Sequence, residues 1–294
     1  MKPDLTSFVR FLRVYCRSPL AVCGLIGTVL VLLAAIFAPL LSPQNPYDLM
    51  QLDIMESRLP PGETAFAGFT FLLGSDGQGR DMLSAILYGL RISLIVGIGS
   101  AALAFVFGTL FGLTAAYIGG RTETVMMRLV DLQMSFPTIL SALLILALMG
   151  KSVGNVVLAI VIVEWATYAR TARGAALSEL RREYVEAARS LRMGHRNIIL
   201  RQLLPNCISP LIVLLTMQIA RAITLEATLS FLGLGVPITE PSLGLLISNG
   251  FELMLSGTYW VSLFPGIALL LTIFSINLVG DRMRQILDPK AAQR

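Results

Sequence analysis

Long uncharged stretches alternate with short charged segments along this chain. Six of the uncharged stretches approach or exceed the roughly 20 mostly apolar residues that a helix needs to cross a bilayer. They lie at 20–41, 92–120, 132–150, 153–169 (apart from Glu164), 202–220 and 253–280. Backbone groups within lipid must bond inside their own segment, so each stretch is predicted to be a helix. The predicted fold class is therefore an all-α integral membrane protein with six transmembrane helices, the fifth continuing past Arg221.

The composition supports this prediction and excludes several other classes. Hydrophobic residues make up 55% of the chain and charged residues only 14%, whereas a soluble domain usually carries about 25% charged residues. The net charge of +5 does not indicate nucleic acid, because the basic residues lie between apolar runs instead of clustering on a polar surface. Three cysteines without a CxxC pair, and a single histidine, predict neither a disulfide framework nor a zinc site.

The basic residues also predict the orientation. With six spans the two termini share one side of the membrane, and that side receives 18 of the 23 Lys and Arg residues. The opposite side receives four: Arg58, Arg80, Arg91 and Lys151. Cytoplasmic loops carry the excess of basic residues, so both termini are predicted to lie in the cytoplasm, with the chain in an inner membrane.

The chain is expected to divide into five parts. They are a cytoplasmic N-terminal helix (1–19), a first transmembrane helix (20–41), a periplasmic loop (42–90), a core of five transmembrane helices (91–280) containing a cytoplasmic loop at 170–206, and a cytoplasmic tail (281–294). The N-terminal part is predicted to be an amphipathic helix in the membrane interface; a frayed tail is the alternative. Its apolar side would carry Phe8, Phe11, Leu12 and Tyr15, and its basic side Arg10, Arg13 and Arg17.

Three glycine-containing patterns have structural explanations. Gly150-Lys151-Ser152 resembles the end of a phosphate-binding loop, but Ile145 occupies the position where that loop needs a glycine. The glycine-rich segment 74–79 follows no βαβ pattern and is read as a turn. Gly108 and Gly112 form a small-xxx-small pair, which is expected to serve helix packing more than gating.

Three charged residues lie nearest the hydrocarbon: Glu164, Arg221 and Glu226. A charge there costs about 2.5–3.5 kcal/mol on insertion scales, and such residues usually face a cavity or pair with one another. They are therefore candidates for the translocation path, with snorkelling from span ends as the alternative. If Arg221 and Glu226 share a helix, their spacing of five is poor for a direct pair.

The segment 170–206 carries eight arginines and a distinctive helical pattern. A helix rich in Ala, Glu and Arg is expected up to a break at Gly194, followed by a second short helix that reaches Pro205. The small side chains of Ala187 and Ala188 would let a partner surface come close. A solvated basic loop is the alternative.

Glu186-Ala187-Ala188, followed at a distance by Leu204-Pro205, resembles the EAA loop of ABC-type importer permeases. The resemblance implies that this loop forms a coupling helix that docks on an ATPase subunit. Two positions depart from the family pattern: Arg192 stands where the glycine is usual, and Gln202 where isoleucine is common. The expected coupling residues are Glu183, Tyr184, Glu186, Ala187, Ala188, Arg189, Gly194 and Pro205.

A second stretch narrows the resemblance. Residues 73–94 and the closing Leu287-Asp288-Pro289-Lys290 are similar to the dipeptide, oligopeptide and nickel permeases, whose fold is the type I ABC importer permease. The length and the single outside loop resemble the C-type subunits of dipeptide importers. The motif residues of the outside loop are Gly74, Asp76, Gly79, Arg80 and Asp81.

The resemblance implies a non-catalytic permease subunit of a binding-protein-dependent importer, with peptides as the default solute. It implies four partners besides membrane lipid: a second homologous permease, two cytoplasmic ATPases and a periplasmic solute-binding protein. ATP and Mg would be held by the ATPases, and this chain is expected to have no cofactor and no catalytic residue. A nickel-chelate or glutathione permease, a secondary transporter and a membrane insertion factor remain alternatives.

Overall fold

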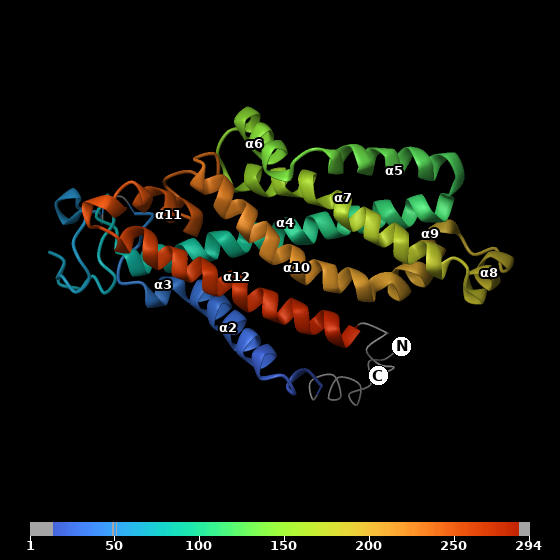
Figure 1. Cartoon of the computed structure of the whole chain (residues 1–294), viewed down its shortest axis with the longest axis horizontal. Coiled ribbons are helices and arrows are strands. Elements are labelled where there is room, and N and C mark those ends of the chain that lie inside the picture. Colours follow the sequence, from blue (N-terminus) through green and yellow to red (C-terminus); the bar gives the residue numbers. More distant parts are fainter. Residues whose placement is uncertain (1–13, 49, 51, 288–294) are drawn as a thin grey trace.

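The computed structural model describes residues 14–48, 50 and 52–287 and is built from helices (Figure 1). Within those residues the only β pairing is two isolated bridges, between Thr64 and Thr70 and between Ser75 and Asp81. The helices are α2 (Pro19–Ile36), α3 (Ala38–Leu41), α4 (Met82–Ile118), α5 (Gly120–Ser135), α6 (Thr138–Met149), α7 (Val153–Glu179), α8 (Glu183–Ser190), α9 (His195–Asn197), α10 (Leu204–Phe231), α11 (Leu243–Phe251) and α12 (Trp260–Leu287). There are also two short 3-10 helices, η2 (Ile54–Glu56) and η4 (Met254–Ser256), and a π-helical segment, η3 (Ile198–Leu203). The predicted all-α class is confirmed.

Among the described residues, five helices are long and apolar enough to cross a membrane, and a bent pair supplies the sixth crossing if it counts as one span. The five are α2, α4, α7, α12 and the continuous run from His195 to Phe231 that contains α10. A helix rises 1.5 Å per residue, so the 37 residues of α4 are far longer than the hydrocarbon core of about 30 Å requires.

The third predicted span, 132–150, is wrong as a continuous helix. The chain forms α5 and then α6, with an angle of 89° between them. The break lies at Phe136, which takes an extended conformation (φ −89°, ψ 139°). Pro137 explains it, because a proline disfavours the helical region for the residue before it. With 12 residues, α6 is only about 18 Å long.

Ion pairs hold α5 along α7. Arg170 Nη2 lies 2.6 Å from Asp131 Oδ1, and Arg173 Nη2 lies 2.7 Å from Glu123 Oε1. Val130 of α5 also packs in an apolar cluster with Ala166 and Ala169 of α7. Because α5 carries these charged residues, its sequence contains no long uncharged stretch. The hydrophobic pattern therefore does not predict α5 as a transmembrane helix.

Several helices extend beyond their predicted ends, because the charged residues at those positions do not end them. The loop 42–90 ends at Asp81, which caps α4, so α4 begins nine residues before Arg91. In the same way α7 continues past Arg170 to Glu179, and α12 continues past Asp281 to Leu287. The first span, predicted as 20–41, is divided at Phe37 into α2 and α3.

The predicted N-terminal helix is only partly described. Phe8, Arg10, Phe11, Leu12 and Arg13 lie outside the described residues. Tyr15 is 4% exposed, and its hydroxyl donates to the Ala21 carbonyl at 3.3 Å. Arg282 of α12 donates to the Val14 carbonyl. This end of the described chain is therefore attached to α2 and α12.

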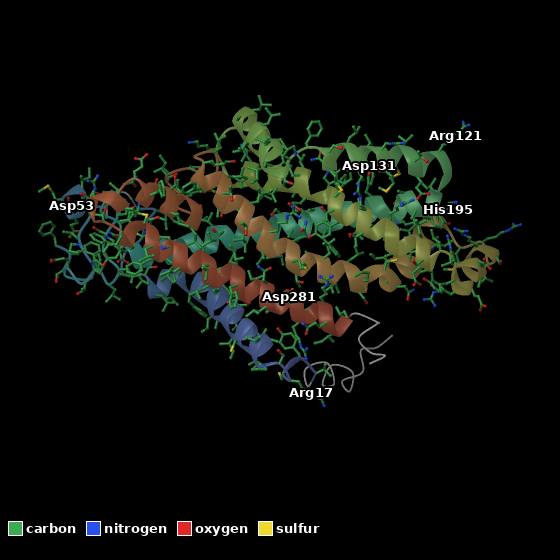
Figure 2. The ribbon with its side chains drawn as sticks, viewed as in Figure 1. Arg17, Asp53, Arg121, Asp131, His195 and Asp281 are labelled. Carbon is green, nitrogen blue, oxygen red and sulfur yellow. The ribbon has the colours of Figure 1, made fainter. Side chains whose placement is uncertain are left out.

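The two ends of the bundle differ in character. Segment 42–81 and α11 form one end, here called the loop end, and α8 projects from the other, here called the α8 end (Figure 1). Figure 2 shows Arg121 and His195 at the α8 end and Asp53 at the loop end. The loop 170–206 and the segment 42–81, which the basic residues predict to lie on opposite sides of the membrane, are thus at opposite ends of the molecule.

The close approach of α4 and α7 depends on two glycines. A Cβ on Gly112 would overlap the carbonyl of Ala169, and one on Gly108 would overlap the carbonyl of Trp165. This is the helix packing expected for the small-xxx-small pair. Phe111, which lies between them in sequence, stacks edge-on against Trp165 with ring centroids 4.9 Å apart.

Gly112→Ala should destabilise the protein, because the new methyl group forces α4 and α7 apart. Overpacking of this kind costs about 1–3 kcal/mol. Gly99→Ala is the matched control, since it lies in α4 with nothing within 4 Å of an added Cβ. Thermal unfolding in detergent should show a lower midpoint for Gly112→Ala alone; equal midpoints would contradict the packing assignment.

Candidate coupling surface and translocation path

The helix α8 stands at the turn between α7 and the long helix that starts at His195 (Figure 1). It has an inward and an outward face. Val185 (0% exposed) and Ala188 (4%) are buried and pack against Ile198 and Leu203. The exposed residues are Glu183, Glu186, Ala187, Arg189 and Ser190.

The two small residues expected to face a partner therefore have different roles. Ala187 is on the exposed face of α8, as expected. Ala188 is buried in the core of the loop and, unlike Ala187, does not lie on the exposed face of α8. Tyr184 also points inward, and its hydroxyl donates to Glu179 Oε2 at 2.7 Å. Burial, together with this hydrogen bond, raises the pKa of Tyr184 to about 12.

The helix α8 ends at Ser190, and its C-cap is Leu191, so the helix stops before Gly194. Arg192 has φ +55°, in the left-handed region, while Gly194 has φ −59° and precedes α9. The Met193 N–H donates to the Ala188 carbonyl at 3.1 Å, and the Arg192 N–H to the Arg189 carbonyl at 2.9 Å. These two bonds form a Schellman motif, whose left-handed position usually holds glycine. The break expected at Gly194 therefore begins earlier, at Leu191, and Arg192 takes the conformation that glycine would favour.

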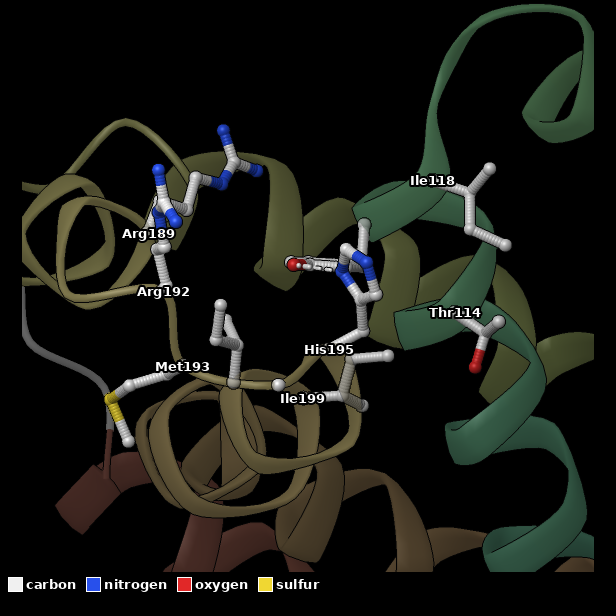
Figure 3. A pocket seen from close by; sticks show the side chains of 10 residues that line it. Thr114, Ile118, Arg189, Arg192, Met193, His195 and Ile199 are labelled. Atoms are coloured by element: carbon white, nitrogen blue, oxygen red, sulfur yellow. Dashed lines mark hydrogen bonds between the residues drawn. The ribbon is translucent and has the colours of Figure 1, made fainter.

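The last turn of α4 contacts this loop through Tyr117. Its hydroxyl lies 2.8 Å from His195 Nδ1, and the Arg189 guanidinium lies 5.5 Å from its ring centroid. Figure 3 shows Arg189 and Arg192 on one side of an open cavity of about 1010 Å³, and His195 with α4 on the other. The loop is thus attached to α4 as well as to α7 and α10.

In the middle of the bundle, Arg221 of α10 and Glu164 of α7 come together. Arg221 Nε lies 3.5 Å from Glu164 Oε1, and Gln218 donates to Glu164 Oε2. The Glu164 side chain is 5% exposed, whereas that of Arg221 is 57% exposed. They line a pocket of about 440 Å³ with Pro137, Thr138, Ile139, Thr224, Leu225 and Thr228.

The third candidate path residue lies elsewhere. Glu226 is fully buried and accepts hydrogen bonds from Ser93 Oγ at 2.9 Å and Ser230 Oγ at 2.7 Å. Five residues turn a helix by about 500°, so Glu226 and Arg221 point in different directions. Glu226 fixes α10 to α4 and does not line the pocket of Arg221.

At the loop end, the segment 74–81 forms the expected turn. Asp76 Oδ1 accepts from the backbone N–H of Gln78 at 2.7 Å and of Arg80 at 2.9 Å. Gly79 has φ +76°, and a Cβ there would overlap the backbone of Asp53. The turn then ends at Asp81, whose Oδ2 accepts from the Ser84 N–H at 2.8 Å and caps α4.

The same turn is fastened to distant elements. Arg80 is 1% exposed, and its Nη2 donates to the Ile238 carbonyl at 3.2 Å. Trp260 at the start of α12 donates from Nε1 to the Ser75 carbonyl at 3.1 Å. Burial raises the pKa of Asp76 and lowers the pKa of Arg80. The motif therefore joins the loop end to α4, α12 and the α10–α11 connection.

Comparison with known proteins identifies the family. Residues 108–293 match the family described as binding-protein-dependent transport system inner membrane component. The chain belongs to this family. Residues 6–61 of the permease also match the N-terminal TM domain of oligopeptide transport permease C. The predicted resemblance to the C-type permeases is confirmed, and the protein is a multi-pass inner membrane protein.

Similar proteins cover nearly the whole permease. It is 37% identical over 270 residues to the di/tripeptide transport system permease protein DppC of Pseudomonas aeruginosa, covering 92% of this chain and 88% of that protein. It is 38% identical over 289 residues to the dipeptide transport system permease protein DppC of Escherichia coli K12, covering 98% and 95%. The solved inward-facing MetNI methionine ABC transporter has a chain with TM-score 0.57 and 18% identity, covering 70% of the permease and 97% of that chain. That likeness shows the fold alone.

Several residues of the pocket and of the coupling loop were not predicted from the sequence. Thr224 and Thr228 share a helix face with Arg221, and their spacing of three and seven residues was a readable signal. Gln218 was visible as a polar residue in an uncharged run. Tyr117 gave no signal, because its contact with His195 joins positions 78 residues apart.

Arg192→Gly should stabilise the turn after α8, because glycine takes the left-handed conformation without a steric cost. The expected gain is about 1 kcal/mol. Arg192→Ala removes the same side chain but keeps the strained conformation, and it is the matched control. Hydrogen exchange at Arg192 and Met193 should slow in the glycine variant relative to the alanine variant; equal rates would contradict the strain.

Proposed function

We propose that this permease is the C-type subunit of an ATP-driven, binding-protein-dependent importer of dipeptides or short oligopeptides. Its relatives carry those substrates in their names, over nearly the full length of the chain. The observation that carries the coupling role is the geometry of α8. This helix projects beyond the bundle and exposes Glu186 and Ala187, while Val185 and Ala188 attach it to the core.

The proposed assembly has this chain and a second homologous permease as a heterodimer. Two cytoplasmic ATPases bind ATP and Mg, and a periplasmic protein delivers the solute. Charge segregation supports an orientation with both termini and α8 in the cytoplasm. In this arrangement the chain needs no catalytic group or cofactor of its own, because bond cleavage occurs in the ATPases.

Coupling then follows from how α8 is attached. Closure of the ATPases displaces the exposed face of α8, and the buried contacts of Val185 and Ala188 carry that displacement to η3 and α10. The hydrogen bond from Tyr184 to Glu179 carries it to α7, and the contact of Tyr117 with His195 carries it to α4. A rigid element with two positions that both partners bias is what such coupling requires.

Glu186→Lys and Ala187→Trp should uncouple transport from ATP hydrolysis, because both alter the exposed face of α8 and leave its core intact. In proteoliposomes with the assembled complex, stimulation of ATPase activity by loaded binding protein and peptide uptake should each fall about tenfold or more, the cost of one poorly matched charge at an interface. Lys151→Glu is the matched control at the opposite end of the bundle and should change neither.

Ala188→Trp separates docking from folding. It should disrupt the loop itself, since Ala188 is buried against Ile198 and Leu203, and limited proteolysis between α7 and α10 should become faster. Ala187→Trp should leave proteolysis unchanged. Normal uptake in both Glu186→Lys and Ala187→Trp would overturn the coupling assignment.

A further inference from the structure

The pocket at Arg221 lies deep within the membrane-spanning part of the bundle. Arg221 is 10 residues from the end of α10 at Phe231, and Glu164 is 11 residues from the start of α7 at Val153. At 1.5 Å per residue, both lie about 15–17 Å from the loop end of their helices. An accessible charge at this depth has to face water or protein, because lipid would not solvate it.

The accessible face of α10 is polar at this level. Arg221, Thr224 and Thr228 follow one another at intervals of three and four residues, so they lie on one side of the helix. Ile223 and Leu229, which point elsewhere, are fully buried. A helix face in contact with lipid would be expected to have apolar residues on the accessible side and polar residues on the buried side.

Arg221 lies beside Glu164, but the hydrogen-bond donors of its guanidinium are not all used. Its approach to Glu164 at 3.5 Å is an ion pair too long to count among good hydrogen bonds. In the described part of the chain, Glu164 is its only ion-pair partner. The guanidinium therefore keeps donors for a second anion, and the planar fork of arginine matches a carboxylate in two parallel bonds.

The pocket discriminates between the charges of a substrate. Glu164 is 5% exposed, accepts from Gln218 and faces Arg221, so it offers a substrate ammonium group little surface. Arg221 is open on the other side of the pair. An anionic group is therefore attracted to the pocket, while Glu164 keeps the site neutral when it is empty.

The threonines provide complementary acceptors. Thr224 and Thr228 donate their hydroxyl hydrogens to the carbonyls of Ala220 and Thr224 at 2.9 and 2.8 Å. Their oxygens keep lone pairs that can accept from a peptide N–H or ammonium group. Seven residues of helix separate Arg221 from Thr228 by about 10 Å, and two extended residues span about 7 Å.

We propose that Arg221 binds the terminal carboxylate of a peptide as it passes through the pore, with the amino end of the peptide toward Thr224 and Thr228. Thr138 of α6 lines the same pocket directly after Pro137, so the break and the start of α6 form its other wall. This inference rests on the proposed function, because it assigns a peptide group to the pore of a peptide importer.

The test compares a dipeptide with its C-terminal amide. Uptake is measured in proteoliposomes with the whole complex and unmodified binding protein, each peptide at a concentration that loads the binding protein equally. Arg221→Ala should reduce uptake of the free acid about tenfold, as expected for loss of a charge-assisted hydrogen bond, and change uptake of the amide less than about twofold. Arg221→Lys should retain part of the activity, and Arg284→Ala, which removes an exposed charge from the end of α12, should change neither.

The ATPase readout distinguishes binding from structure. Arg221→Ala should keep ATPase stimulation by loaded binding protein, because docking of α8 is unaffected. If Arg221→Ala reduced uptake of the acid and of the amide equally, the inference would be overturned. It would also be overturned if Arg221→Ala prevented assembly of the complex, because Arg221 would then pair with an acidic residue of the second permease. Absence of dipeptide uptake by the wild-type complex would instead contradict the proposed function.

Discussion

The cost of placing a charge in hydrocarbon constrains the rest of this structure. Three charged residues inside the bundle, Glu164, Arg221 and Glu226, are stabilised by different surroundings. Glu226 is buried among serine hydroxyls and joins α10 to α4. Glu164 is buried beside Gln218 and Arg221, and Arg221 is left open to a pocket. The helices therefore have to be arranged so that this pocket faces water or another subunit.

The helices that carry this pocket are also those that flank α8. Glu164 lies on α7, which leads into α8, and Arg221 lies on α10, which follows it through η3. A displacement of α8 that alters the separation of α7 and α10 would act directly on the 3.5 Å ion pair. The exposed surface of α8 is thus connected through α7 and α10 to the polar pocket at Arg221 in the middle of the bundle.

Sequence patterns predicted the apolar helices well, because the hydrophobic requirement of lipid is recorded in the residues themselves. They placed helix ends poorly at Arg91 and Arg170, since a charged side chain near the membrane surface does not interrupt backbone hydrogen bonding. The break before Pro137 was readable from the proline, but the separate helix α5 was hidden by its charges. The roles of Ala188 and Tyr117 depend on contacts between distant segments, which no local pattern specifies.

The central claim is that the face of α10 bearing Arg221 is aqueous in the assembled transporter. Single cysteines at Thr224 and Thr228, introduced after replacing Cys16, Cys23 and Cys207, can be tested with a water-soluble maleimide in native membranes during ATP turnover. The account predicts labelling at both positions and none at Ile223 or Leu229, which are fully buried. Labelling of Thr224 and Thr228 only by a lipid-soluble reagent would contradict it.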